Sequence, residues 1–337
     1  MKKVSVIIPC FNATKYLPKC FMSLVQQTIG IDQIELIFVD DASTDEDATW
    51  NMLQEFERAY PESIMILKLE ENMRQGGARN VALQYATGEY IAFVDADDFV
   101  SENFLLETYE KAKESDADII QFEYFYYTDR LGAVDSGRNI TPEVIEISSV
   151  SDRKKFLISE KVTYGCWNKL YRHDLLKSAH TAYAEHVIYE EPLFVYPLLY
   201  FADKIVILND AYYYYRQNDS GTMRNDMRQE ETLKMHADVQ LAVWNFMKKT
   251  PFFKEYYDEI KLYFLHTYLY ETLYFAKLRG FKLSYAFYKE LEKTVITEVP
   301  DYDESTYSAL IPKQMELYRM IGEGMTEEKF GGYWERL

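Results

Sequence analysis

The most informative segment of the chain is Tyr90-Ile-Ala-Phe-Val-Asp95-Ala96-Asp97-Asp98. Its first five residues are mostly apolar and predict a buried strand, and three carboxylates follow within four residues. Like charges crowded at a strand end repel one another unless a cation neutralises them. A hard divalent cation suits this pattern, because it binds one or two carboxylates together with substrate phosphates. An acidic turn or a helix N-cap is the ordinary alternative for such aspartates.

Strands and helices are predicted to alternate on both sides of this stretch. Continuous β-branched and aromatic runs predict strands, and helical spacing with capping residues predicts helices. This order predicts an α/β fold with a mostly parallel sheet and helices on both faces. The predicted strands span 4–8, 34–39, 64–69, 90–94 and 119–124, and the predicted helices span 17–28, 46–60, 78–86 and 102–115.

A second acidic pair, Asp40-Asp41, follows the predicted strand over 34–39. In parallel sheets, ligands bind outside the carboxyl ends of the strands. We therefore expect Asp40 and Asp41 to share one edge of the sheet with the carboxylates from Asp95 to Asp98.

The second part of the chain has a different character. A polar loop or hairpin is predicted over 131–153, a tyrosine-rich strand over 211–216, and a linker over 218–226. Beyond the linker an aromatic stripe at helical spacing predicts a mostly helical region. We expect a catalytic domain over 1–220 and a helical C-terminal region over 221–337. The stripe leaves three roles open, which are packing against the catalytic domain, homodimer formation and contact with lipid.

The overall charge limits the partners. The 337 residues include 37 basic and 55 acidic side chains, which gives a net charge of −18. Such a surface repels nucleic acid, so no nucleic-acid partner is expected, and a phosphorylated substrate needs a cation beside it. Three cysteines without a CxxC pair, no signal peptide and no membrane-spanning run predict a cytoplasmic protein. Peripheral contact with the inner face of the cell membrane stays open.

Six segments, in this order, resemble the family 2 glycosyltransferases, which have a GT-A fold. Together they lie within about the first 220 residues. They are Val4-Ser-Val-Ile-Ile-Pro-Cys-Phe-Asn12, Phe38-Val-Asp-Asp-Ala-Ser-Thr-Asp45, Gly77-Ala-Arg-Asn80, Gly88-Glu-Tyr-Ile-Ala-Phe-Val-Asp-Ala-Asp-Asp98, Trp167-Asn-Lys-Leu-Tyr-Arg172 and Tyr189-Glu-Glu-Pro-Leu-Phe194.

The resemblance implies a nucleotide site at the first two strand ends. Pro9 and Asn12 would shape the nucleotide pocket after the first strand. Asp41 would accept a hydrogen bond from the uracil ring, with Asp40 supporting it. Arg79 would lie beside the base or the diphosphate.

The resemblance also implies the sugar and acceptor sides of the site. Asp95 and the adjoining Ala96 would contact the ribose or the donor sugar, and Asp97 would bind Mg²⁺ or Mn²⁺. Glu191 matches the catalytic base, although Glu190 beside it stays an alternative. A carboxylate in this role takes the proton of the acceptor hydroxyl as that oxygen attacks the anomeric carbon.

Three positions depart from the family pattern. Glu191 stands where an aspartate is usual and is one methylene longer. Arg74, two residues after Asn72, and Ala42 both stand where glycine is common. These changes put the backbone path of the two loops in question.

The resemblance implies transfer of a sugar, with inversion, from a UDP-sugar to a hydroxyl of a glycan or lipid-linked acceptor. Capsule, exopolysaccharide or lipopolysaccharide synthesis is the implied setting. A nucleotidylyltransferase is one alternative, but it would need a Gly-rich basic loop after the first strand, and residues 10–16 contain only Lys15. A non-catalytic nucleotide-sugar- or glycan-binding descendant is the other. Trp167 is open to two roles, stacking on a sugar or packing in the core.

Overall fold

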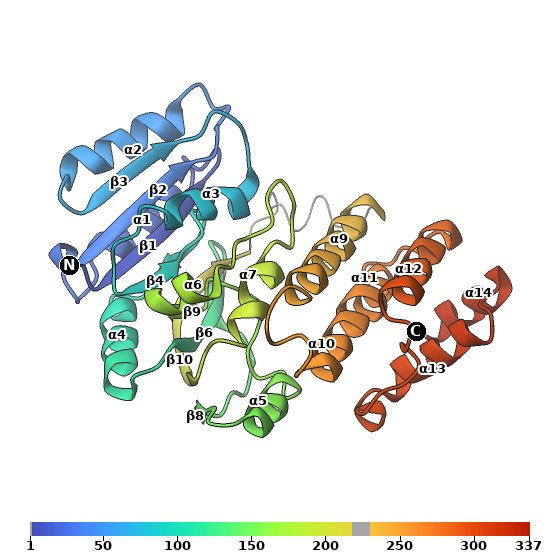
Figure 1. Cartoon of the computed structure of the whole chain (residues 1–337). Helices are drawn as coiled ribbons and strands as arrows, with labels where there is room; N and C mark the ends of the chain where they lie inside the picture. Colours follow the sequence, from blue (N-terminus) through green and yellow to red (C-terminus); the bar gives the residue numbers. More distant parts are fainter. Residues whose placement is uncertain (1, 218–229) are drawn as a thin grey trace. The chain divides into compact units, whose positions relative to one another are not determined.

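The computed structural model describes residues 2–217 and 230–337 of the chain (Figure 1). It forms two compact units, Met1–Asp219 and Ser220–Leu337. The predicted linker over 218–226 lies outside the described residues.

The first half of the sheet is parallel. Strand β1 (Val4–Cys10) lies between β2 (Ile34–Asp40) and β4 (Tyr90–Phe93) and is parallel to both. Strand β3 (Ile64–Lys68) continues the parallel order on the outer side of β2. All seven residues of β1 are buried, as expected for a strand covered on both faces.

The second half of the sheet is mixed. Strand β9 runs antiparallel between β4 and β6, and the long strand β10 returns parallel to β6. In the described residues the full order is β3-β2-β1-β4-β9-β6-β10-β5, with β7 paired to β6 and β8 to β10. The prediction of a mixed, mostly parallel sheet is thus confirmed. The bounds are β5 (Phe99–Val100), β6 (Ile119–Thr128), β7 (Gly132–Asp135), β8 (Glu143–Glu146), β9 (Lys169–Arg172) and β10 (Lys204–Arg216).

Helices cover both faces of the sheet. On one face, apolar residues of α1 (Leu17–Val25), α2 (Ala48–Ala59) and α4 (Phe104–Ser115) join the sheet residues in one buried cluster. On the other face, Phe93 of β4 makes edge-to-face contacts with the rings of Tyr183 and Phe194. The remaining helices of this unit are α3 (Arg74–Leu83), α5 (Val150–Leu157), α6 (His173–Ala179) and α7 (Glu191–Leu198).

Helix α3 begins four residues earlier than its predicted start at residue 78. Gly76 and Gly77 therefore lie inside the helix, although glycine weakens helices. The reason is close packing, because a Cβ at Gly76 would lie 2.4 Å from the carbonyl oxygen of Ala184 and 2.8 Å from Cγ of Glu190. The sequence alone carries no sign of this neighbour.

The second unit is helical, as predicted for the C-terminal region. Much of its aromatic stripe is used inside the unit, since Tyr256, Ile260 and Phe264 are buried. Phe264 stacks on Trp244, the largest fully buried side chain of the described residues. No helix in the described ranges combines the length and apolarity needed to cross a membrane. The helices are α9 (Glu230–Met247), α10 (Tyr257–Phe264), a π-helical stretch (Leu265–Glu271), α11 (Thr272–Leu278), α12 (Tyr285–Glu298), α13 (Pro312–Gly322) and α14 (Glu327–Arg336).

Candidate active site

The sheet brings the two acidic segments to one edge. Asp40 is the last residue of β2 and pairs with Cys10 of β1, and Asp95 follows β4 by two residues. Since β2 and β4 flank β1 in parallel, their carboxyl ends meet at the same edge.

Asn12 joins the loops that follow β1 and β2. Its backbone N–H donates to Oγ of Ser43 over 2.9 Å, and its Oδ1 accepts from the N–H of Thr44 over 2.8 Å. Asn12 has a φ of 49°, a left-handed conformation that asparagine tolerates better than most residues. Pro9 is buried inside β1, so it shapes this edge through the backbone.

Asp41 connects the β2 loop to the segment before α3. Its Oδ1 accepts from the backbone N–H of Met73 over 2.7 Å, and burial raises its pKa. The neighbouring Asp40 is buried, and its Oδ1 accepts from the N–H of Ser43. Its Oδ2 is buried without a hydrogen-bond partner among the described residues.

The two loops keep a left-handed backbone where the family commonly has glycine. Ala42 has a φ of 54° and Arg74 a φ of 58°. For residues with a Cβ, this conformation costs about 1 to 2 kcal/mol. Although Ala42 and Arg74 are not glycines, the backbone is therefore left-handed at both positions.

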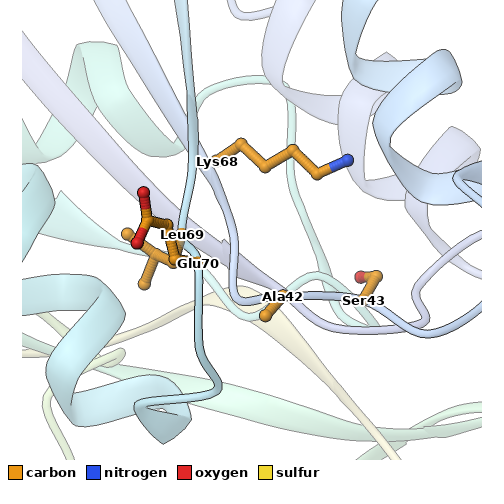
Figure 2. A pocket seen from close by; sticks show the side chains of 5 residues that line it. All are labelled: Ala42, Ser43, Lys68, Leu69 and Glu70. Carbon is orange, nitrogen blue, oxygen red and sulfur yellow. The ribbon is translucent and has the colours of Figure 1, made fainter.

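An open depression lies beside Asp41. It has a volume of about 610 Å³ and is lined by Ala42, Ser43, Lys68, Leu69 and Glu70. Figure 2 shows the Lys68 side chain facing the loop of Ala42 and Ser43. The Lys68 ammonium donates to Oδ1 of Asp47 over 2.6 Å. The cation that lines this depression is therefore paired with a carboxylate of the protein.

The carboxylates after β4 have different surroundings. Asp98 is buried and accepts from the hydroxyl of Tyr213 over 2.7 Å and from the N–H of Arg216 over 2.6 Å. Burial, followed by the charges of Asp97 and Asp95, raises its pKa well above the ordinary value. Asp97 is partly exposed, and its backbone carbonyl accepts from Nε of Arg216. Ala96 packs in the buried apolar cluster.

Asp97 fits a divalent cation only together with ligand oxygens. In the parts of the chain that the structure describes, no three His, Cys, Asp or Glu side chains lie close enough together to form a metal-binding site by themselves. A hard cation such as Mg²⁺ is nevertheless commonly held by one or two carboxylates plus substrate phosphates and water. A partly exposed aspartate at a strand end offers that type of donor.

Arg79 links the loop after β4 to the start of α7. Its guanidinium is 1% exposed and donates to Oδ1 of Asp95 and to Oε1 of Glu190, both over 2.6 Å. Burial raises the pKa of Glu190 to about 7, although the charge of Arg79 opposes that shift. Arg79, which the resemblance implied to lie beside the base or the diphosphate, is engaged here by two protein carboxylates.

Glu190 and Glu191 are held in different ways. Glu190 is 1% exposed and bound to Arg79, whereas Glu191 is partly exposed at the first turn of α7. Oε1 of Glu191 accepts from the backbone N–H of Cys166 over 2.7 Å, which leaves its second oxygen outside this bond. Of the two carboxylates, Glu191 is therefore the one placed to meet a ligand.

Three supporting residues were not among the predicted site residues. Tyr213 and Arg216 come from β10 and bind Asp98, more than 110 positions away in the chain. Lys169 is fully buried, and its ammonium donates to Oγ1 of Thr163 and to the carbonyl of Gly165, next to the residue that binds Glu191. Burial lowers the pKa of Lys169 to about 7. Tyr213 and Arg216 belong to the strand predicted over 211–216, and Lys169 begins β9. Nothing in the sequence around them names the groups that they bind.

Comparison with known proteins agrees with this architecture. The model of the family described as Glycosyl transferase family 2 matches residues 5–179. Glycosyltransferase GlyG of Streptococcus pneumoniae is 31% identical over 235 residues, which cover 66% of this chain and 73% of the relative. A poly(ribitol-phosphate) beta-glucosyltransferase of Bacillus spizizenii is 29% identical over 215 residues, 63% of this chain but only 32% of that relative.

Solved structures show the same fold. The crystal structure of Staphylococcus aureus TarS residues 1–349 in complex with UDP-GlcNAc superimposes with a TM-score of 0.73 at 23% identity. The match covers 98% of this chain and 89% of the TarS chain. The family model spans more than half of the sequence and GlyG is similar over most of its length, so this chain belongs to glycosyltransferase family 2.

Proposed function

We propose that the chain transfers a sugar from a UDP-sugar to a hydroxyl of a glycan or lipid-linked acceptor, with inversion, in the synthesis of a cell-surface polysaccharide. The observation that carries the proposal is the location of Asp41, Asp95 and Asp97 at one sheet edge, with Glu191 linked to that edge through Glu190 and Arg79. The Bacillus spizizenii relative is a poly(ribitol-phosphate) beta-glucosyltransferase, and TarS is a poly(ribitol-phosphate) beta-N-acetylglucosaminyltransferase; both names support a setting in polymer synthesis.

The depression beside Asp41 is proposed to hold the uracil ring. A carboxylate can accept a hydrogen bond from the ring N–H, and Asp41 is fixed for this by the N–H of Met73. The TarS structure contains UDP-GlcNAc, which supports a UDP-linked donor here.

Glu191 is proposed as the general base. The bond between the acceptor oxygen and the anomeric carbon forms while the bond between that carbon and the diphosphate oxygen breaks. The acceptor proton passes to the carboxylate of Glu191, which the N–H of Cys166 orients. Glu190 and Arg79 would act as positioning residues, since both are buried and face protein groups.

Asp97 is proposed to hold Mg²⁺ or Mn²⁺ together with the donor phosphates. When bound, the cation would stabilise the negative charge that develops on the departing UDP. Arg216 and Tyr213 would keep the Asp97 loop in place by binding its backbone and its neighbour Asp98.

A donor panel scored by UDP release tests the proposal. With a suitable donor and acceptor, chelator and Asp97→Ala are expected to abolish turnover. Glu191→Gln is expected to lower kcat by at least about 10²-fold while UDP still binds. Glu110→Gln, an exposed carboxylate on α4, serves as the matched control. Normal transfer by Glu191→Gln would overturn the base assignment, and UDP binding without turnover on any donor would favour a non-catalytic descendant.

A further inference from the structure

Four aromatic side chains gather at the ends of β6 and β10. Tyr126 pairs in register with Tyr215, and the indole of Trp167, just before β9, stacks on Tyr215 with ring centroids 5.3 Å apart and planes 17° apart. Tyr124 meets Trp167 edge to face at 4.8 Å. Tyr124 and Tyr126 also place their hydroxyls 3.4 Å apart. We call Tyr124, Tyr126, Trp167 and Tyr215 the aromatic platform.

The platform adjoins both ends of the proposed active site. Trp167 follows Cys166, whose N–H binds the carboxylate of Glu191. The Trp167 ring also lies 4.7 Å from the ring of Tyr213, whose hydroxyl binds Asp98. The platform therefore lies between the acidic loop after β4 and the proposed base.

The platform lies at the edge of the buried apolar cluster, against which Tyr124, Trp167 and Tyr215 pack. Tyr126 is 38% exposed, and Tyr124, Trp167 and Tyr215 are each only partly buried. By contrast, the neighbouring Tyr213, which belongs to the core, is 0% exposed. Ring surface thus stays accessible beside a catalytic carboxylate.

We propose that the aromatic platform is the acceptor subsite and that it stacks the ring of an uncharged sugar residue. The C–H face of a pyranose packs on aromatic rings, while its hydroxyls reach polar groups at the rim. A sugar held there would carry its hydroxyl to Glu191. The inference rests on the proposed transferase function and adds the class of acceptor, a neutral glycan.

The neighbouring cations favour an uncharged acceptor over a phosphate-bearing one. Arg216, next to Tyr215, pairs with Asp129 over 2.6 Å, and Arg138 pairs with the buried Glu123, which precedes Tyr124. Lys169 is fully buried and donates to neutral oxygens. These cations are engaged by protein groups, and the net charge of −18 repels a polyanion.

The test uses the full-length chain and three variants. Tyr126→Ala is expected to raise the KM for neutral oligosaccharide acceptors about tenfold, which corresponds to the loss of about 1.4 kcal/mol of aromatic contact. Tyr126→Phe, which keeps the ring, is expected to stay within about threefold of wild type. Tyr85→Ala removes a 47% exposed tyrosine of the segment after α3 and is the matched control. Circular dichroism confirms that each variant is folded.

Binding is also measured without turnover. Saturation-transfer NMR with neutral oligosaccharides is expected to show ring contacts for wild type and Tyr126→Phe and to lose them in Tyr126→Ala. An unchanged acceptor KM and unchanged NMR contacts in Tyr126→Ala would overturn the platform, as would acceptance of polyol-phosphate polymers only. If no donor releases UDP at all, the transferase proposal fails, while the NMR experiment still decides whether the platform binds sugar.

Discussion

Arg79 holds together two carboxylates from distant parts of the chain. At a pH above 7, where Glu190 is ionised, replacing Arg79 by Met would leave Asp95 and the buried Glu190 without their cation. Because breaking a buried ion pair exposes the remaining charge to a low dielectric, Arg79→Met is expected to lower the free energy of unfolding by about 3 to 5 kcal/mol. Denaturant unfolding measures this change. Arg58→Met, at an exposed position, should change the free energy of unfolding by less than about 0.5 kcal/mol. Equal effects of the two substitutions would contradict a stabilising role for the pairing of Arg79 with Asp95 and Glu190.

Glu190 gives a prediction on pH. Burial raises its pKa from the ordinary 4.5 to about 7, so between these values the folded state binds a proton that the unfolded state lacks. Its contribution to stability is therefore complete below pH 4.5 and is lost as the pH rises through 7. The side chain introduced by Glu190→Gln does not titrate. The free energy of unfolding of this variant, relative to wild type, should therefore rise by up to about 3 kcal/mol between pH 5 and 8. Thermal unfolding of both proteins across this pH range checks the sign of the difference. A variant that loses stability relative to wild type as the pH rises would show that Arg79 keeps Glu190 ionised throughout.

The end of β10 supports the loop after β4. The hydroxyl of Tyr213 donates to Asp98 and accepts from the N–H of Asp95. Tyr213→Phe would leave both groups short of a partner, so it is expected to cost about 1 to 3 kcal/mol of stability and to weaken metal-dependent UDP binding about tenfold. Calorimetry measures the binding. Tyr214→Phe on the same strand is the control, since the hydroxyl of Tyr214 makes no hydrogen bond to the described residues. Equal losses of stability and of UDP binding in the two variants would rule out this role for the end of β10.

Elements with strong periodicity were predictable, whereas their ends depended on neighbours. The strands over 4–8 and 34–39 were recognisable because a buried parallel strand is a continuous apolar run. The start of α3 was not predictable, because Gly76 and Gly77 signal a break until Ala184 and Glu190 are known to pack against Gly76, and Met73 against Gly77. The strand over 119–124 was predicted too short, because pairing with β10 continues to Tyr127 and pairing with β7 continues to Thr128.

At the scale of the whole molecule, the two units each have a buried apolar core. We propose that the unit over 1–219 is the catalytic domain and folds without the helical unit. A fragment ending at Asp219 is expected to unfold cooperatively and to bind UDP within about tenfold of the full chain. Its circular dichroism and calorimetry check this prediction. Loss of cooperative unfolding would mean that the helical unit is needed for the catalytic fold.

Local periodicity and short contiguous motifs were enough to predict the α/β class, the sheet edge of Asp41 and Asp97, and the family. Which carboxylates bind protein groups became known from the folded chain alone. It paired Arg79 with Asp95 and Glu190, and it brought Tyr213 and Arg216 to Asp98. The physical reason is that burial and ion pairing arise between strands and helices far apart in the chain, and no local pattern encodes those distances.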